Sequence, residues 1–153
     1  MKIKIILALL ISTFCNAQIT LNDMKTIIKM DYDSFETFAM NKGFLFSKFC
    51  EVEFECVSYT KGLGEKTKFI TLYTKHIEVN GKSVTYQTNS ETEYLLFKKQ
   101  MKEQGFILFD TVEWQEKGVL FKYYKNKNYK LTIGVGKNEI NTVTYEISID
   151  YLE

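Results

Sequence analysis

The chain has 153 residues, and its 20 basic and 19 acidic residues leave a formal net charge of +1. Every basic residue is a lysine, so the chain lacks the guanidinium group that binds phosphate through two parallel hydrogen bonds. A near-neutral balance without a basic patch argues against nucleic acid as a partner.

Residues 1–17 have the pattern of a secretory signal peptide. A short lysine-containing start precedes an apolar stretch over residues 5–14, which is too short to span a bilayer. Small residues at Cys15 and Ala17 predict cleavage after Ala17, and therefore a periplasmic or secreted protein. The alternative is a lipoprotein acylated at Cys15, but that requires a small preceding residue, and Phe14 is large. No later stretch is long and apolar enough for a transmembrane segment.

The rest of the chain matches itself when it is shifted so that Tyr32 falls on Tyr94. Without a gap, the same shift also pairs Phe35, Gly43, Phe44, Glu51, Val57, Lys68 and Lys75 with Phe97, Gly105, Phe106, Glu113, Val119, Lys130 and Lys137. A three-residue deletion then aligns residues 84–86 with residues 143–145. The match predicts two tandem repeats, residues 18–89 and residues 90–153.

In the first repeat, residues 21–30 place apolar side chains at helical spacing. Asp33 and Glu36 resemble a capping box, which predicts a second helix over residues 34–42 that ends at Gly43. Strands are expected over residues 44–54, 57–61, 67–78 and 82–89. The pair Asn80-Gly81 predicts a hairpin between the last two of these strands.

In the second repeat, Ser90 and Glu93 give the same capping signature, and Gly105 ends the predicted helix. Strands are expected over residues 106–114, 119–125, 129–136 and 142–151. The last strand alternates apolar and polar residues from Val143 to Tyr151, which is typical of a sheet covered on one side only.

These elements predict an α+β fold in which two helix–β-meander repeats form one antiparallel sheet, with the helices on one face. The order of elements and the duplication resemble PepSY-like domains and the β-lactamase-inhibitory-protein fold. The resemblance implies a binding or inhibitory module of the cell envelope, whose open, concave sheet face docks a partner. It lies in the order of elements, so it transfers no functional residue to this chain.

Cys50 and Cys56 are candidates for a disulfide, because an exported protein meets an oxidising environment. On one continuous strand the two would lie about 20 Å apart, so a bond requires the chain to reverse near residues 52–54. The repeat places a connection at this point, so a disulfide and two buried thiols both remain open. A metal site is not expected, since the chain offers a single histidine.

Residues that could carry out catalysis are few. His76 ends a predicted strand, and a surface histidine explains it better than a general base does. Glu51, Glu53 and Glu55 form an acidic row typical of a solvated strand face. Neither an enzyme activity nor a cofactor is therefore expected.

Candidate partner-binding positions lie on the predicted hairpins and on the polar face of the last strand. The hairpin around residues 122–130 mixes lysines with tyrosines, and the single tryptophan ends a neighbouring strand. Thr85 and Gln87 of the first repeat would join the polar face of the last strand. The candidate residues are Trp114, Tyr123, Tyr124, Tyr129, Thr144 and Glu146.

The first functional hypothesis is a non-catalytic exported protein that binds a protein partner through its open sheet face and hairpin tips. The alternative is a carrier that holds a small apolar ligand between its helices and its sheet, since the chain has 12 Phe and 10 Tyr. The sequence does not indicate an oligomeric state.

Overall fold

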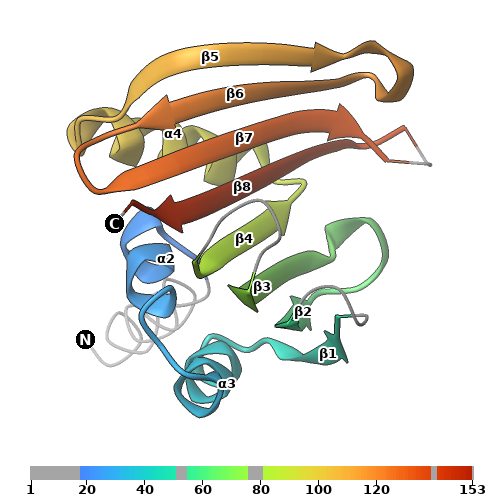
Figure 1. Cartoon of the computed structure of the whole chain (residues 1–153). Helices are drawn as coiled ribbons and strands as arrows, with labels where there is room; N and C mark the ends of the chain where they lie inside the picture. Colours follow the sequence, from blue (N-terminus) through green and yellow to red (C-terminus); the bar gives the residue numbers. More distant parts are fainter. Residues whose placement is uncertain (1–17, 51–54, 76–80, 139–140, 153) are drawn as a thin grey trace, which may run out of the picture.

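The computed structural model describes residues 18–50, 55–75, 81–138 and 141–152. This part of the chain is α+β, as predicted, with three helices and one eight-stranded antiparallel sheet (Figure 1). The helices are α2 (Leu21–Ile27), α3 (Tyr32–Asn41) and α4 (Glu91–Glu103). The strands are β1 (Leu45–Phe49), β2 (Glu55–Lys61), β3 (Lys68–Lys75), β4 (Ser83–Thr88), β5 (Ile107–Trp114), β6 (Val119–Lys125), β7 (Tyr129–Lys137) and β8 (Val143–Tyr151).

The strand order is β1-β2-β3-β4-β8-β7-β6-β5, so the first four strands form one half of the sheet and the last four form the other (Figure 1). β4 and β8 pair at the centre, where Val84 lies opposite Ile149 and Tyr86 lies opposite Ile147. The edge strands are β1 and β5. Since successive residues of a strand point to opposite sides, each strand divides its side chains between two faces of the sheet.

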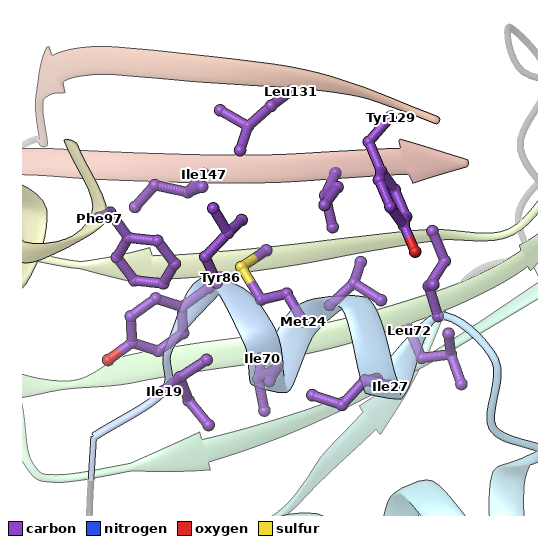
Figure 2. Close-up of a cluster of buried hydrophobic side chains, with 14 of the residues drawn as sticks. Ile19, Met24, Ile27, Ile70, Leu72, Tyr86, Phe97, Tyr129, Leu131 and Ile147 are labelled. Atoms are coloured by element: carbon purple, nitrogen blue, oxygen red, sulfur yellow. The ribbon is translucent and has the colours of Figure 1, made fainter. Parts of the chain in front are cut away.

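One of these faces carries the hydrophobic core. Met24 and Ile27 of α2 are fully buried and belong to one cluster with Ile70 of β3, Tyr86 of β4 and Ile147 of β8 (Figure 2). The cluster also takes in buried side chains from α3 and α4. We call the opposite side, which carries the alternate residues of each strand, the open face.

The first two helices begin at residues whose side chains accept backbone hydrogen bonds. Thr20 caps α2 in a capping box with Asp23. Asp31 caps α3 by accepting a 2.9 Å hydrogen bond from the backbone N–H of Ser34. The capping box predicted at Asp33 is therefore wrong, because Asp33 already lies in the first turn of α3.

Ser90 caps α4, as predicted, but Glu93 does not complete a capping box. The Glu93 carboxylate is buried and accepts 2.8 Å hydrogen bonds from the hydroxyls of Tyr86 and Thr88 on β4. It also forms an ion pair with Lys68 of β3. Burial and the Glu93 charge raise the pKa of Tyr86. Glu93 thus links the helix of the second half to two strands of the first half.

Some features recur in the structure at the offset that the sequence match uses. Gly43 and Gly105 both follow a helix in the left-handed conformation, with φ of 79° and 71°. A bulge interrupts β1 between Phe46 and Lys48, and another interrupts β5 between Leu108 and Asp110. The recurrence extends from the ends of α3 and α4 into the edge strands.

The gap-free alignment does not extend into the next strands. Tyr59 of β2 is buried in the core, whereas Phe121 of β6, the residue aligned with it, lines hollows on the open face. A shift of one residue in a strand moves a side chain to the other face. The sequence match therefore misassigns the faces of β2 and β6.

A disulfide joins Cys50 and Cys56 beside the β1–β2 pair. Their Cα atoms are 5.2 Å apart, and the backbone N–H of Cys50 donates a 3.1 Å hydrogen bond to the carbonyl of Cys56. Cys50 thus directly follows β1 and Cys56 lies on the adjacent strand β2, so the two do not lie along one continuous strand. The strand predicted over residues 44–54 ends at Phe49, and residues 51–54 lie outside the described chain.

The predicted signal peptide and the pair Asn80-Gly81 also involve residues outside the described ranges. Across those ranges, no helix has both the length and the hydropathy needed to cross a bilayer.

Candidate binding groove on the open face

The polar strand face predicted from the sequence, which we call the floor, lies at the centre of the open face. Thr85 and Gln87 of β4 lie directly opposite Ser148 and Glu146 of β8. The hydroxyls of Thr85 and Ser148 are 3.0 Å apart and form a hydrogen bond. Thr144 continues the same row on β8, and the alternation of this strand thus gave the correct face for all of these residues.

Three hollows adjoin one another along this floor. The largest, of about 460 Å³, reaches from Ser148 and Asp150 to Tyr123 on β6. A second, of about 220 Å³, includes Thr144, and it shares Trp114, Phe121 and Glu146 with the first. A third, also of about 220 Å³, shares Gln87 and Thr144 with the second.

We call the three hollows together the groove. The groove follows β8 from Thr144 to Asp150, which corresponds to roughly 20 Å at about 3.3 Å per residue. The hollows also extend across the sheet, from Phe69 on β3 to Trp114 on β5.

Two glycines on β7 make room for one wall of the groove. A Cβ atom on Gly134 would lie 3.0 Å from Cε1 of Phe121, and one on Gly136 would lie 2.9 Å from Cγ2 of Val119. The β6 side chains Phe121 and Val119 therefore lie across β7, where any larger residue would push them aside. Alternate glycines in a strand signal such a close approach, and the sequence reasoning missed it.

The aromatic residues on this side of the groove hold lysine side chains. The ammonium group of Lys117 lies 4.0 Å from the ring centre of Trp114, within the range of a cation–π interaction. The ammonium group of Lys130 lies 5.4 Å from the ring centre of Tyr123. Trp114 ends the edge strand β5, and 44% of its surface is exposed. The rim is thus aromatic, and two lysine side chains of the chain itself lie over its rings.

Glu146 occupies the middle of the groove, between Gln87 on one neighbouring strand and Gly134 on the other. It is open to solvent, yet the surrounding walls remove part of its water and raise the pKa of its carboxyl group. Burial, and secondly the Glu146 charge, raise the pKa of Tyr73 on β3. Within the described ranges, no side chain forms a hydrogen bond or ion pair with the Glu146 carboxylate.

Trp114, Tyr123, Thr144 and Glu146 line the groove, so four of the candidate residues come together on one face. The other two, Tyr124 and Tyr129, lie on the core side. Tyr129 is buried in the core cluster, and Tyr124 packs against that cluster. These two tyrosines therefore do not line the groove, and their contact with a partner stays a prediction.

The alternation of β6 explains why Tyr124 does not line the groove. Adjacent residues of a strand point to opposite faces, so Tyr123 and Tyr124 cannot both face the groove. Tyr129 opens β7 on the core side, where its ring contacts that of Tyr151 at a centre-to-centre distance of 5.4 Å.

The other candidates for chemistry do not join the groove. His76, Glu51 and Glu53 lie outside the described residues. Glu55 begins β2, is exposed, and accepts a 3.4 Å hydrogen bond from the hydroxyl of Thr74. Among the residues that the structure describes, no cluster of His, Cys, Asp and Glu could hold a metal ion.

No protein-family model, curated protein or solved structure matches this chain. The groove is therefore the basis for interpreting function, through its shape and its side chains.

Proposed function

We propose that this protein is an exported, non-catalytic binding module whose groove takes an extended segment of a protein partner. The observation that carries the proposal is the row of three adjoining hollows along β8. An extended peptide is long and narrow, and it reads pockets through alternate side chains. A groove of roughly 20 Å would take about six residues of such a segment.

The lining of the groove supports a protein partner. Trp114 and Tyr123 offer aromatic anchors at one side, and tryptophan and tyrosine dominate the binding energy of many protein interfaces. Thr144 and Gln87 offer polar groups that can exchange hydrogen bonds with a peptide backbone. The Ser148 hydroxyl bonds to Thr85 rather than to a base, which is consistent with binding rather than catalysis.

The proposal also includes the export of the protein and the origin of its two halves by duplication. The disulfide between Cys50 and Cys56 is of the kind that persists in oxidising compartments, which agrees with the predicted signal peptide. The left-handed glycines and the bulges that recur at the repeat offset favour an origin of residues 18–89 and 90–153 as copies. The likeness to PepSY-like domains and to the β-lactamase-inhibitory-protein fold remains part of the proposal.

The alternative role as a carrier of an apolar ligand gains no support from the hollows. All three open on the face opposite the core, and none lies between the helices and the sheet. The large aromatic residues Phe35, Phe44, Tyr86 and Phe97 are fully buried within the core.

The proposal can be tested by capturing partners from cell-envelope and secreted fractions with the full chain carrying a C-terminal tag. The variants Thr144→Lys and Glu146→Lys should fold normally and lose a partner that the wild-type chain retains. The matched control is Glu103→Lys, which makes the same charge change as Glu146→Lys on an exposed site of α4. Equal capture by all four proteins would contradict the proposed site, and circular dichroism would verify that each variant is folded.

A further inference from the structure

We infer that the partner segment inserts a lysine or arginine side chain into the largest hollow, with its apolar stem on Phe121 and its charged end at Glu146. The inference rests on the proposed function and names the chemistry that the groove would recognise.

The charges around the largest hollow favour a cation. Its lining includes three acidic residues, Glu113, Glu146 and Asp150, against one basic residue, Lys130. The ammonium group of Lys130 lies over the Tyr123 ring at the rim. An acidic ligand would be repelled by the carboxylates of Glu113 and Glu146 here, whereas a cation would be attracted to them.

The position of Glu146 specifies where that cation would lie. Its carboxylate has no hydrogen-bonding or ionic partner within the described ranges, and it stands where the groove removes part of its water. An apolar ligand would remove more water and leave this charge unpaired, which is costly. A lysine or arginine end would instead supply charged N–H donors to the carboxylate.

Phe121 explains why the cation should be carried on an apolar stem. A Cβ atom on Gly134 would lie 3.0 Å from the Phe121 ring and 3.7 Å from Cβ of Glu146, so ring and carboxylate side chain flank the same glycine. A ligand that reaches Glu146 at this point therefore passes along an aromatic surface. Lysine and arginine side chains combine a long apolar stem with a charged end.

The length of the groove favours a peptide segment over a free amine. A single amine would fill one hollow and leave the continuation toward Thr144 and Asn138 unused. In an extended peptide, side chains on the same side recur about every 7 Å. A residue two positions from the cation could therefore reach the hydroxyl of Thr144.

The test begins with a phage-displayed library of random seven-residue peptides, selected on the immobilised full chain. Selected peptides are synthesised, and their affinities are measured by the fluorescence of Trp114. This residue is the only tryptophan of the chain and lies in the groove, so its emission reports occupancy directly. We expect a lysine or arginine at one fixed position of the selected peptides.

One substitution in the peptide and one at Glu146 form a double-mutant cycle, which measures the contact between the peptide lysine and Glu146. On the wild-type chain, replacing the peptide lysine by norleucine, which keeps the stem and removes the charge, should weaken binding roughly tenfold or more. Glu146→Gln should weaken the lysine peptide by a similar factor and leave the norleucine peptide little changed. The control Glu103→Gln removes a carboxylate from an exposed site on α4 and should change neither affinity.

The outcomes separate the inference from the proposed function. Peptides that bind the groove without a cationic residue, or that bind Glu146→Gln as tightly as the wild type, would overturn the inference and leave the groove as a binding site. A selection whose peptides bind Thr144→Lys and Glu146→Lys as well as the wild type, or that yields no enriched peptide, would contradict both.

Discussion

The two halves of the sheet share a strand order and a pair of bulges, but their open faces differ. On β2 and β3 the open face holds Ser58 and Thr71, which are buried and joined by a 3.0 Å hydrogen bond. On β7 the corresponding face holds Gly134 and Gly136, and the space above them belongs to the groove. The same backbone arrangement thus supports a buried polar contact in one half and an open space above two glycines in the other.

The difference teaches that side-chain size, rather than the path of the strands, creates the groove. Two residues without a Cβ let Phe121 and Val119 lie across β7, and Trp114 stands at the edge beyond them. The predictions test this difference between the two halves, beginning with the contact that joins them.

The largest effect is expected at Glu93, which joins α4 of the second half to β3 and β4 of the first. Glu93→Ala would leave the Lys68 ammonium and the hydroxyls of Tyr86 and Thr88 without their acceptor. Breaking a buried pair in this way should lower the free energy of unfolding by about 3 kcal/mol. Urea unfolding followed by circular dichroism measures the change.

The control for Glu93→Ala is Glu103→Ala, at an exposed site of the same helix. Its only ion pair in the described chain, with Lys99 at 3.9 Å, is exposed, so the expected change is below about 0.5 kcal/mol. Equal destabilisation by the two variants would show that Glu93 does not act as a link.

The next largest effect is a loss of stability that concerns the first half alone. Replacing both Cys50 and Cys56 by alanine removes a bond that closes a short loop, and should lower the free energy of unfolding by about 2 kcal/mol. Because the disulfide lies beside β1 and β2, the affinity of the groove for a selected peptide should not change. A parallel loss of peptide binding would mean that the two halves are coupled.

A smaller change in stability, with a clear effect on binding, is expected in the second half. In Gly134→Ala the new Cβ would press on Phe121 at 3.0 Å, so the ring must move toward the groove. We expect a cost of about 1 kcal/mol and a several-fold loss of peptide affinity. Gly81→Ala, where no atom lies within 4 Å of the added Cβ, should bind the peptide as the wild type does.

The smallest effect concerns Glu146 and depends on pH. Because the pKa of its carboxyl is raised in the folded protein, the folded state holds this proton more tightly than the unfolded chain does. The ionised group therefore costs stability above the folded-state pKa, and this cost disappears as the pH falls toward about 4. Glu146→Gln should be slightly more stable than the wild type at pH 7 and equally stable near pH 3.

The pH comparison includes every charged group of the two hollows that Glu146 lines, namely Lys117, Lys130, Lys137, Glu113 and Asp150. These groups are the same in the wild type and in Glu146→Gln, so the difference between their melting temperatures isolates Glu146. A variant that melts below the wild type at pH 7 would contradict the expected cost.

Much of the fold could be predicted because local patterns and tertiary structure agree. The alternation from Val143 to Tyr151 gave the correct faces of β8, and the sequence prediction of residues 119–125 matches β6. The cap of α3 was misplaced because Asp31 and Asp33 are both good capping residues by type. The geometry of the chain entering the helix selects Asp31.

Only part of the groove could be predicted from local sequence patterns. Its polar floor follows from one strand, whereas its wall depends on which side chains of β6 cross the glycines of β7. The gap-free alignment of the repeats would have turned Phe121 to the core, as Tyr59 is, so the register of β6 had to come from strand pairing. Such pairing between strands is not encoded in any single segment.

The bulges also affect how the two edges of the sheet could pair with another strand. Each edge strand shows exposed apolar residues, including Leu45 and Phe49 on β1 and Ile107 on β5, which is the surface on which sheets grow into fibres. A bulge interrupts the regular ladder of each edge, and a charged residue, Lys48 or Asp110, follows it directly. Deleting Ser47 or Phe109, the residue inside each bulge, would straighten that edge and give a second molecule a continuous strand to extend. One extra residue at each end of the sheet thus interrupts the edge that a second molecule could extend.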